Sequence, residues 1–353
     1  MNRICISSVF FAVISLALAG CGASSSGDSI VTNGRGSANG SDGGSVQLLN
    51  VSYDPTRELW KDLNKAFEAA AKTKTGTTVS VKQSHGASGS QARAVIDGLE
   101  ADIVSLALWT DTEQIHRKGL IKDGWEDAFP NRSLPYTSTI VFVVRKGNPK
   151  AIRDWSDLKR PELQIITPNP KTSGNGKLAF LAAWGSVVLN GGTEDKAREF
   201  VTTLYKQVPV LDTGARGATT TFAQKGIGDV HQTWENEAQL EIAEAKGELE
   251  VVYPSMSILA EPHVAVVDQN VDRRGTREVA QKYLEFLYTP EGQAIIARHF
   301  YRPSDAAVLE QHRRSFPDLR LFRITEISKG WDDAQTRFFA DGGEFDKIYD
   351  GGR

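Results

Sequence analysis

The sequence predicts an α/β fold made of two lobes with a cleft between them. Short apolar segments alternate with segments of helical periodicity, this alternation occurs in two separate series, and two long apolar strands lie between the series. Each long strand carries the chain from one lobe to the other, so two crossings make a hinge. The predicted division is residues 46–138 and 262–353 for the first lobe and residues 139–261 for the second.

The first series begins with an apolar strand at Val46–Val51 and a helix at Pro55–Ala71. Asp54 is expected to cap this helix, because its side chain is a good acceptor and proline favours the first helical position. The next elements are a strand at Thr77–Val81, a helix at Ser90–Ala101 and a buried strand at Asp102–Leu108. This alternation predicts parallel strands with helices on both faces of the sheet.

The second series runs from the strand Thr139–Arg145 to the apolar segment Ile258–Asp268. Between them we expect a strand at Gln164–Thr167 and helices at Lys177–Val188, at Glu194–Tyr205 and around Ala218–Lys225. Two helices, Thr276–Leu287 and Pro290–His299, follow the return to the first lobe. The last residues, 341–353, are expected to form a frayed tail with a short packed segment at 345–348.

The composition is that of a folded protein and excludes several classes of function. Of 353 residues, 40% are hydrophobic and 24% are charged, which rules out global disorder. There are 41 Lys and Arg against 44 Asp and Glu, and a formal charge of −3 excludes a generally basic nucleic-acid binder. Two cysteines, Cys5 and Cys21, are too few for a disulfide framework or a multi-cysteine zinc module. We expect neither a metal nor a cofactor.

Residues 1–20 are typical of a bacterial lipoprotein signal peptide. Arg3 supplies the early charge, and Val9–Ala19 is apolar but too short to span a bilayer. Small residues directly before Cys21 resemble a lipobox, in which the signal is cleaved and this cysteine is acylated. A plain secretory signal with a chance cysteine is the alternative. Cleavage would remove one cation and no acid, which changes the formal charge from −3 to −4.

The segment that follows, residues 21–45, is expected to be a flexible tether. It is rich in Gly, Ser, Asn and Asp and has almost nothing to bury. Such a tether would hold the folded part near a membrane partner at a raised effective concentration. No later segment has enough consecutive apolar residues to predict a membrane span.

The candidate chemistry lies at loop-to-helix junctions. Three of them share one design, at residues 52–55, 84–90 and 169–176, and a fourth segment at 212–219 is similarly rich in small residues. Helix N-termini carry unpaired N–H groups and a partial positive charge, so they hold anions. Small residues let the backbone approach the anion closely. Because the junctions fall in both lobes, we predict a shared anion site in the cleft.

Other kinds of site find less support in the sequence. Ser84 and His85 are adjacent, which is poor geometry for a nucleophile and its base. His231 lies near glutamates, but nothing completes a metal site. The run at 174–177 lacks the glycine spacing and the final Ser or Thr of a P-loop. A lipid-anchored scaffold or adhesin is a further alternative, although it would not need glycine-bearing helix starts facing one cleft.

Many runs of the body match one known family. They include LLNVSYDPTREL (48–59), QSHGASG (83–89), EADIVSLAL (100–108), PYTSTIVFVVRKGNP (135–149), ITPNPKTSG (166–174), LDTGARG (211–217), WENEA (234–238), YTPEGQ (288–293) and FYRP (300–303). On these residues the chain resembles the periplasmic sulfate-binding proteins of ABC importers, including the thiosulfate-binding branch. The resemblance implies a type II periplasmic binding protein fold, with two lobes and the ligand in the interlobe cleft.

The resemblance also implies that sulfate is held, without water, by hydrogen-bond donors alone. Seven donors carry over by motif: the backbone N–H groups of Asp54, Ser88, Gly174, Asn175 and Ala215, the hydroxyl of Ser173 and the indole N–H of Trp234. The family usually has glycine where Asn175 stands, but the N–H survives, and asparagine tolerates left-handed geometry. Arg216 and His85 are expected beside the site in supporting roles. The pattern by itself favours a core position for Trp234, since most tryptophans are largely buried.

A lining made only of donors favours sulfate over phosphate. Sulfate is fully ionised near pH 7, whereas phosphate keeps a proton, and leaving that proton unpaired costs about 1–3 kcal/mol. Thiosulfate, molybdate and phosphate remain alternative ligands. The resemblance implies a binding protein and not an enzyme, with the permease of an ABC transporter as its partner. We expect a monomer on the extracytoplasmic face of the membrane, held there by lipid on Cys21.

Overall fold

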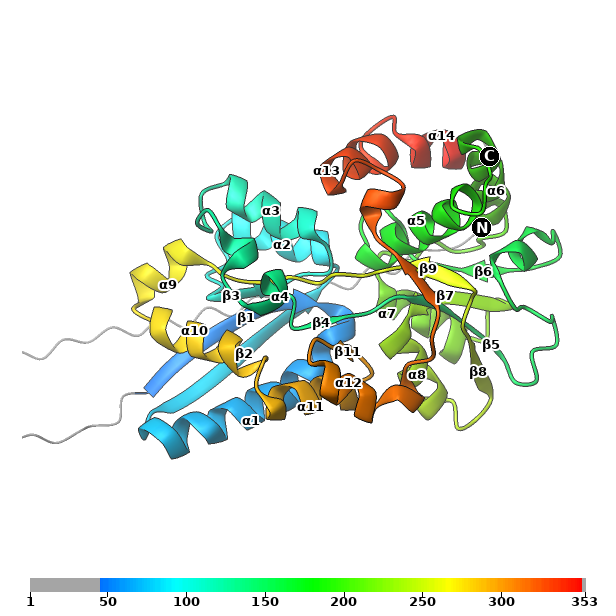
Figure 1. Ribbon diagram of the computed structural model, residues 1–353. Coiled ribbons are helices and arrows are strands. Elements are labelled where there is room, and N and C mark those ends of the chain that lie inside the picture. Colours follow the sequence, from blue (N-terminus) through cyan, green and yellow to red (C-terminus); the bar gives the residue numbers. More distant parts are fainter. Residues whose placement is uncertain (1–44, 351–353) are drawn as a thin grey trace, which may run out of the picture. The chain divides into compact units, whose positions relative to one another are not determined.

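The computed structural model describes residues 45–350, and within them the chain forms two main sheets with helices packed on both faces of each (Figure 1). The expected signal peptide, the lipid site at Cys21 and the tether as far as residue 44 lie outside the described residues. Within the described part, none of the helices is both long and apolar enough to cross a membrane.

The first sheet has the strand order β10-β3-β1-β2. Its strands are β1 (Ser45–Tyr53), β2 (Thr78–Gly86), β3 (Ile103–Ser105) and β10 (Val264–Val266). As predicted, β1 is parallel to β2 and β3. The returning strand β10 is antiparallel to β3, which the prediction of parallel strands did not include. Leu48 packs into the core on one face of this sheet and Val51 into the core on the other, because successive side chains of a strand alternate.

Helices on both faces complete the first lobe. One face holds α1 (Arg57–Thr75), α9 (Asp268–Arg274), α10 (Arg277–Phe286) and α11 (Pro290–Arg298), and the other holds α2 (Ser88–Ile96) and α3 (Trp109–Arg117). The shorter elements are α4 (Pro130–Ser133), β4 (Tyr136–Thr137), β11 (Arg302–Pro303) and α12 (Ala306–Gln311). Strand β4 pairs with β11 in a separate two-stranded sheet.

The start of α1 differs from the prediction that Asp54 caps it. Asp54 lies inside a short 3-10 turn, and α1 begins after that turn at Arg57. The Asp54 side chain makes no capping hydrogen bond, because its Oδ1 accepts from Arg57 Nη2 at 2.8 Å. The hydroxyl of Thr56 donates back to the Tyr53 carbonyl at 2.6 Å and closes the turn. The Asp54 carboxylate is therefore engaged by the Arg57 side chain and does not cap the helix.

The second sheet has the strand order β6-β7-β5-β8 and is mixed, so the prediction of parallel strands is wrong here. Its strands are β5 (Ile140–Arg145), β6 (Ile165–Ile166), β7 (Val230–Trp234) and β8 (Leu249–Val252). Strand β7 is parallel to β6, but β5 is antiparallel to both β7 and β8. The chain enters β5 directly from the first lobe, without the helical crossover that a parallel pair requires.

The second sheet is also covered on both faces. Ile140, Phe142 and Val144 face the core beneath α5 (Gly174–Val188) and α6 (Glu194–Lys206). Val141 and Val143 face the core beneath α7 (Ala215–Thr219) and α8 (Glu235–Glu244). Strand β5 is therefore buried on both sides, which explains its continuous apolar sequence.

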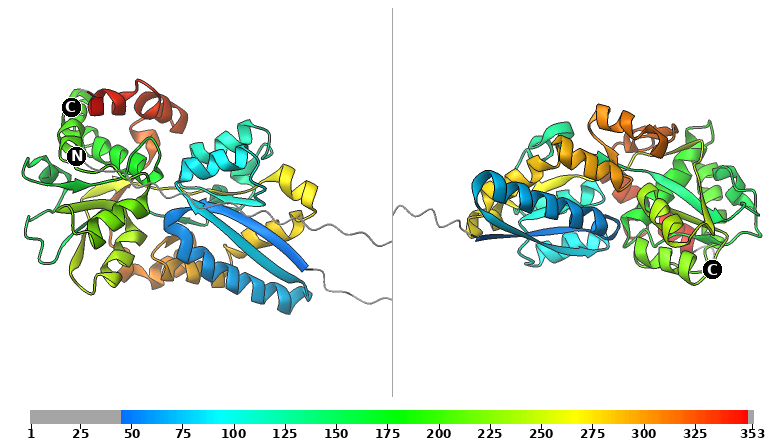
Figure 2. Two further views of the ribbon diagram at one scale, coloured as in Figure 1. Left: turned by 180° about the vertical axis from the view of Figure 1, so that it is seen from behind. Right: turned by 90° about the horizontal axis from the view of Figure 1, so that it is seen from below.

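The C-terminal segment corrects the predicted division into lobes, because residues 320–350 pack on the second lobe (Figures 1 and 2). Strand β12 (Arg320–Phe322) pairs with β9 (Met256–Ile258), and the helices α13 (Trp331–Ala334) and α14 (Glu344–Asp350) follow. The rings of Phe338 and Phe345 lie 5.7 and 6.2 Å from the ring of Phe180 in α5. The chain therefore crosses between the lobes a third time, and the last described residues form a packed helix because Phe345 and Ile348 are buried.

The first two crossings lie side by side. Ser138 and Ala260 form an antiparallel bridge. The Thr139 hydroxyl donates to the Ile258 carbonyl at 2.8 Å, and all four residues are buried. These contacts tie the two segments together, as the hinge prediction requires.

Candidate functional site

Four helix starts, two from each lobe, meet at one small pocket, whose cavity volume is about 10 Å³. The turn at Asp54 follows β1, and α2 follows β2, so both come from the carboxyl ends of neighbouring parallel strands. The starts of α5 and α7 face them from the second lobe. The pocket is lined by the seven predicted residues, Asp54, Ser88, Ser173, Gly174, Asn175, Ala215 and Trp234, and by Tyr53, Pro55, Gly86, Ala87 and Ala107.

Backbone N–H groups are the main hydrogen-bond donors of this pocket. The first four N–H groups of a helix have no partner within the helix. In α2 the N–H groups of Ser90 and Gln91 already bond to the Ala87 carbonyl at 2.9 and 3.0 Å. The N–H of Ser88, the first residue of that helix, remains for the pocket, and the partial positive charge of the helix start favours an anion there.

The side chain of Ser88 is occupied by the first lobe itself. Its hydroxyl donates to Asp111 Oδ2 at 2.5 Å and accepts from the Ala107 N–H at 2.9 Å. Burial raises the pKa of Asp111, although Lys177 and this hydrogen bond lower it. The hydroxyl is therefore held by two partners, and only the backbone of Ser88 is available to a ligand.

Ser173 and Asn175 lie at the start of α5. The Ser173 hydroxyl accepts a long hydrogen bond of 3.4 Å from the Gly176 N–H, which leaves its own proton without an acceptor among the described residues. The Asn175 side chain turns away and donates to the Gln232 carbonyl at 3.0 Å, which ties α5 to β7. Asn175 does not adopt a left-handed backbone, so the expected tolerance for that geometry is not used.

Trp234 is both a core residue and a pocket residue. It ends β7, its side chain is buried, and its ring lies 5.3 Å from that of Tyr53 in the other lobe. The two interpretations that the sequence left open are therefore compatible. The Tyr53 hydroxyl is buried with no hydrogen-bond partner among the described residues, and burial raises the pKa of Tyr53.

The two lobes lie close together at Gly174. A Cβ on this residue would lie 2.7 Å from the Ala107 Cβ of the first lobe, which is shorter than two carbon atoms allow. A Cβ on Gly214 would lie 3.7 Å from Asp54 Oδ2 and 3.8 Å from the Ala87 Cβ, which is ordinary contact. Position 174 therefore requires glycine for the closed arrangement of the lobes, whereas position 214 has room for a methyl group.

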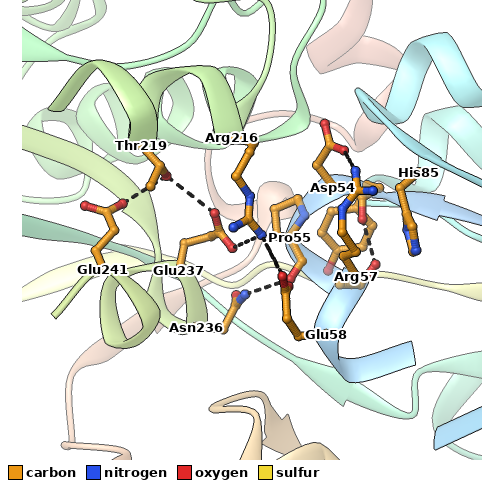
Figure 3. A network of polar contacts seen from close by, with 12 residues as sticks. Asp54, Pro55, Arg57, Glu58, His85, Arg216, Thr219, Asn236, Glu237 and Glu241 are labelled. Carbon is orange, nitrogen blue, oxygen red and sulfur yellow. Dashed lines mark hydrogen bonds and ion pairs between the residues drawn. The ribbon is translucent and has the colours of Figure 1, made fainter. Parts of the chain in front are cut away.

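Arg216 lies beside the pocket in a network of acidic residues (Figure 3). Its Nη2 is 3.2 Å from Glu58 Oε2 in the first lobe and 3.4 Å from Glu237 Oε1 in the second. Glu237 is buried and also accepts from the Thr219 hydroxyl at 3.4 Å. Burial raises the pKa of Glu237, and Arg216 acts in the opposite direction. Arg216 is not among the residues that line the pocket, in agreement with a supporting position.

His85 lies behind the pocket in the first lobe. It stands opposite Ser52 in the pairing of β1 with β2, and the Ser52 hydroxyl donates to its Nδ1 at 2.6 Å. Its Nε2 is 2.6 Å from Gln83 Oε1, an atom that can only accept, so Nε2 carries the proton. Burial and the nearby Arg57 lower the pKa of His85 to about 4. The imidazole is therefore neutral at pH 7 and braces the two strands that lead into the pocket.

The charges around the pocket are arranged without a lining cation. Of the twelve lining residues, Asp54 is the charged one, and its carboxylate is paired with Arg57. A group of three or more side chains that could hold a metal ion does not occur within residues 45–350. His231 is instead paired with Glu241, at 2.9 Å. The pocket suits a ligand that accepts hydrogen bonds from helix starts.

Sequence reasoning missed part of the site. Ala107 follows β3, and Gly174 packs against it. Asp111 accepts a hydrogen bond from Ser88, and Glu58 forms an ion pair with Arg216 beside the pocket. Ala107 could have been found, because the loop after β3 is one more strand-to-helix junction in the same parallel sheet. Glu58 and Asp111 carry no local signal, since each acts through a residue that is distant in the sequence.

The chain is similar to bacterial proteins that bind solutes outside the cell. Residues 48–302 match the family described as bacterial extracellular solute-binding protein. The chain is 55% identical over 305 residues to the sulfate-binding protein of Escherichia coli (strain K12), which covers 86% of this chain and 93% of that protein. It is 49% identical over 304 residues to the thiosulfate-binding protein of Pseudomonas aeruginosa, with coverage of 86% and 92%. The solved structure of the sulfate-binding protein SubI from Mycobacterium tuberculosis H37Rv matches with a TM-score of 0.76 at 32% identity, over 83% of this chain and 99% of that one.

Proposed function

This chain belongs to the bacterial extracellular solute-binding proteins, and we propose that it captures sulfate between its two lobes and delivers it to an ABC-type importer. The observation that carries the proposal is the convergence of four helix starts from both lobes on one pocket. Helix starts with small residues are suited to a compact anion, because the backbone can approach it closely.

Seven donors are assigned to the anion under this proposal. They are the backbone N–H groups of Asp54, Ser88, Gly174, Asn175 and Ala215, the Ser173 hydroxyl and the Trp234 indole N–H. Support comes from their common position around the pocket and from the Ser173 proton, which has no acceptor among the described residues. The assignment gives the first lobe two donors and the second lobe five.

Local dipoles would compensate the charge of the bound dianion. Removing an anion from water is costly unless it is hydrogen-bonded, and oriented backbone N–H groups supply that compensation without a formal countercharge. This agrees with a pocket lined by no Lys, Arg or His side chain among the described residues. Because no buried cation has to be left behind, the anion can also be released, as transport requires.

The same lining would discriminate against phosphate. Near pH 7 phosphate still carries a proton, which needs an acceptor inside the pocket. The Asp54 carboxylate is the acidic group there, and it is already paired with Arg57 at 2.8 Å. An unpaired proton on the ligand costs about 1–3 kcal/mol.

Ligand binding and lobe closure are coupled in this proposal. Donors from both sides reach the anion only when the lobes are together, so the anion binds the closed form preferentially. The closed form would then dock on the permease subunits of the importer. We assign the protein a binding role and no catalytic step, and we expect it to act as a monomer.

The N-terminus would place the protein at its importer. The family description locates these proteins outside the cell, and the lipobox-like residues before Cys21 support acylation of that cysteine. The segment up to residue 44 would then tether the body to the extracytoplasmic face of the membrane. Its length would let the pocket exchange ligand while the protein stays near the permease.

Thiosulfate is the second candidate ligand, favoured by the 49% identity to a thiosulfate-binding protein. It presents acceptor oxygens in a similar tetrahedral shape, so the same donors could hold it.

Titration calorimetry with sulfate, thiosulfate, molybdate and phosphate at neutral pH tests the proposal. We expect one sulfate per chain and phosphate binding that is weaker by about tenfold or more. Sub-millimolar binding of phosphate with none of sulfate would contradict it. Tighter binding of thiosulfate than of sulfate would keep the fold and the pocket but exchange the ligand.

A further inference from the structure

We propose that Asn236 is a positioning residue that holds one donor of each lobe, the Asp54 N–H and the Trp234 indole N–H, together before the anion binds. This role rests on the proposed function. Asn236 lies in the first turn of α8 in the second lobe, two residues after Trp234, and its side chain is buried. It does not itself line the pocket.

The side chain of Asn236 makes its hydrogen bonds to the first lobe. Its Nδ2 donates to the Pro55 carbonyl at 3.3 Å and to the Tyr301 hydroxyl at 2.9 Å, while its Oδ1 has no partner among the described residues. The Tyr301 hydroxyl in turn donates to the same Pro55 carbonyl at 2.8 Å. A closed set of three hydrogen bonds therefore ties Asn236 to Pro55, which follows Asp54 in the turn (Figure 3).

The residue before Asn236 is bound to the first lobe as well. Glu235 accepts two hydrogen bonds from the Arg302 guanidinium, both at 2.8 Å, and the two side chains are 0% and 12% exposed. The backbone N–H of Glu235 donates to the Thr139 carbonyl in the first crossing at 3.0 Å. The start of α8 is thus tied to the first lobe at two consecutive residues, directly after Trp234.

Trp234 itself lies at the hinge. It stands opposite Ile140 in the pairing of β7 with β5, next to the first crossing. Its ring lies 5.3 Å from that of Tyr53, which precedes Asp54 in the first lobe. Atoms near a hinge move least when two lobes separate, so these contacts persist in the open form.

The start of α5, elsewhere around the pocket, meets the first lobe differently. The hydrogen bonds of the Ser173 hydroxyl and the Asn175 side chain stay within the second lobe. Gly174 faces the first lobe through its contact with the Ala107 methyl group. Separating such a contact breaks no hydrogen bond, whereas separating Asn236 from the first lobe breaks two buried ones. The lobes therefore open more easily at α5 than at α8.

The Asp54 N–H and the Trp234 indole consequently stay together when the pocket opens. Two donors that are already in position lose no conformational freedom when the anion arrives. The donors at the starts of α5 and α7 join on closure, so the closed form still binds the anion more tightly. Removing the Asn236 side chain should therefore slow the association of sulfate, and the size of this effect should depend on the Trp234 indole.

Titration calorimetry with sulfate provides the test, on the full chain and on Asn236→Ala, Trp234→Phe and the double variant. We expect Asn236→Ala to weaken binding by about five- to tenfold, the size of one lost hydrogen bond. In the Trp234→Phe background the same change should weaken binding by less than about twofold, because the second donor is already missing. A residue with a merely structural role would give the same fold-change in both backgrounds.

Two further measurements sharpen the test. Stopped-flow tryptophan fluorescence on Asn236→Ala should show slower association of sulfate and an almost unchanged dissociation rate. Tyr301→Phe keeps the ring and removes only the hydroxyl, so it is the milder variant should Asn236→Ala fail to fold. It should weaken sulfate binding by about threefold, and by less when Trp234 is replaced.

Asn270→Ala is the matched control. The Asn270 side chain is also buried, and its Nδ2 donates to the Ala101 carbonyl at 2.8 Å, but both residues belong to the first lobe. This variant loses the same kind of hydrogen bond and should bind sulfate as the unaltered protein does.

Equal weakening by Asn236→Ala with and without the Trp234 indole would overturn the role of Asn236, and so would a change confined to the dissociation rate. Weakening of the same size in Asn270→Ala would also overturn it, because the loss would then follow from general destabilisation. Sulfate binding by the unaltered protein would keep the proposed function in each of these cases. Absence of that binding would overturn the proposed function and the role of Asn236 together.

Discussion

Ser88 and Ser173 stand at helix starts on opposite sides of the same pocket, but the structure uses their hydroxyls differently. In the first lobe the Ser88 hydroxyl is held by Asp111 and by the Ala107 N–H. In the second lobe the Ser173 hydroxyl accepts one long hydrogen bond and keeps its proton free of described acceptors. The same residue type therefore serves the fold on one side and is open to the ligand on the other.

The position of a serine at a helix start therefore does not tell whether its hydroxyl binds the ligand or another part of the protein. The difference is made by Asp111, a buried acid 23 residues further along the chain that captures the Ser88 proton. The first half of the pocket is thus restricted to backbone donors, which no substitution at those positions removes except by proline. Donation by side chains is concentrated in the second half, where substitutions can test it.

The largest loss of sulfate affinity is expected from a substitution that keeps every donor of both lobes but prevents the lobes from closing. Gly174→Ala retains the backbone N–H, but its Cβ would lie 2.7 Å from that of Ala107 in the closed form. We expect sulfate binding to weaken by about 3 kcal/mol, the upper range for overpacking, with little change in thermal stability without ligand. Titration calorimetry and a melting curve measure the two quantities.

Two further variants sharpen this prediction. Ala107→Gly combined with Gly174→Ala should restore much of the affinity, because the first change removes the opposing carbon. Gly214→Ala, with its nearest contact at 3.7 Å, should bind almost as tightly as the unaltered protein. Normal binding by Gly174→Ala alone would show that the closed lobes can lie further apart than in this structure.

The second prediction sets the two serines against each other. Ser173→Ala should weaken sulfate binding by about 2 kcal/mol, the value for a hydrogen bond to a charged group. It should lower stability by only about 0.5 kcal/mol, because the cap that its hydroxyl gives α5 is one long hydrogen bond. Ser88→Ala should do the reverse, because the buried Asp111 and the Ala107 N–H each lose a partner, a loss of about 1–3 kcal/mol in stability. Calorimetry and urea unfolding on the same samples separate the effects.

The proposed difference between the two serines would be wrong if Ser88→Ala bound sulfate more weakly but were as stable as the unaltered protein. The Ser88 hydroxyl would then contact the ligand. The difference would also be wrong if Ser173→Ala unfolded more readily but bound sulfate normally. Ser90→Ala is a suitable control, because Ser90 lies in the same first turn of α2 but outside the pocket lining.

The smallest expected effect is on the pH dependence of folding stability, and it concerns His85 in the first lobe. Folding holds the pKa of His85 at about 4, whereas the unfolded chain has a value near 6.5. Between these values the unfolded chain binds a proton that the folded chain does not, so stability falls as the pH falls through this window. His85→Gln should flatten that fall by about 1 kcal/mol, a value reduced from the full shift because the ring is partly exposed.

Unfolding in urea at pH 7 and at pH 5 measures this slope. His116 offers a control of opposite sign, because Asp123 raises its pKa and its contribution is lost as the pH rises. His116→Gln should therefore destabilise the protein more at pH 5 than at pH 7. A slope in His85→Gln equal to that of the unaltered protein would show that the strand pair tolerates a charged imidazole.

Prediction from the sequence succeeded where one short segment contains its own signal. Each junction that lines the pocket combines a strand end, small residues and a helix start, so its place could be read locally. The cap at Asp54 failed because Arg57, three residues later, competes for the carboxylate. The division into lobes failed after residue 320, because β12 pairs with a strand more than 60 residues earlier.

The sequence by itself determined the alternation of strands and helices and the loop-to-helix junctions that meet at the pocket, because period and glycine placement are local properties. The seven residues assigned to the ligand came from the resemblance to a known family. Only the tertiary structure decided which hydroxyl is free, which glycine the closed lobes require and which acid Arg216 reaches across the cleft. These depend on partners such as Asp111, Ala107 and Glu58, and contacts between residues distant in the chain are fixed by packing and leave no periodic trace in the sequence.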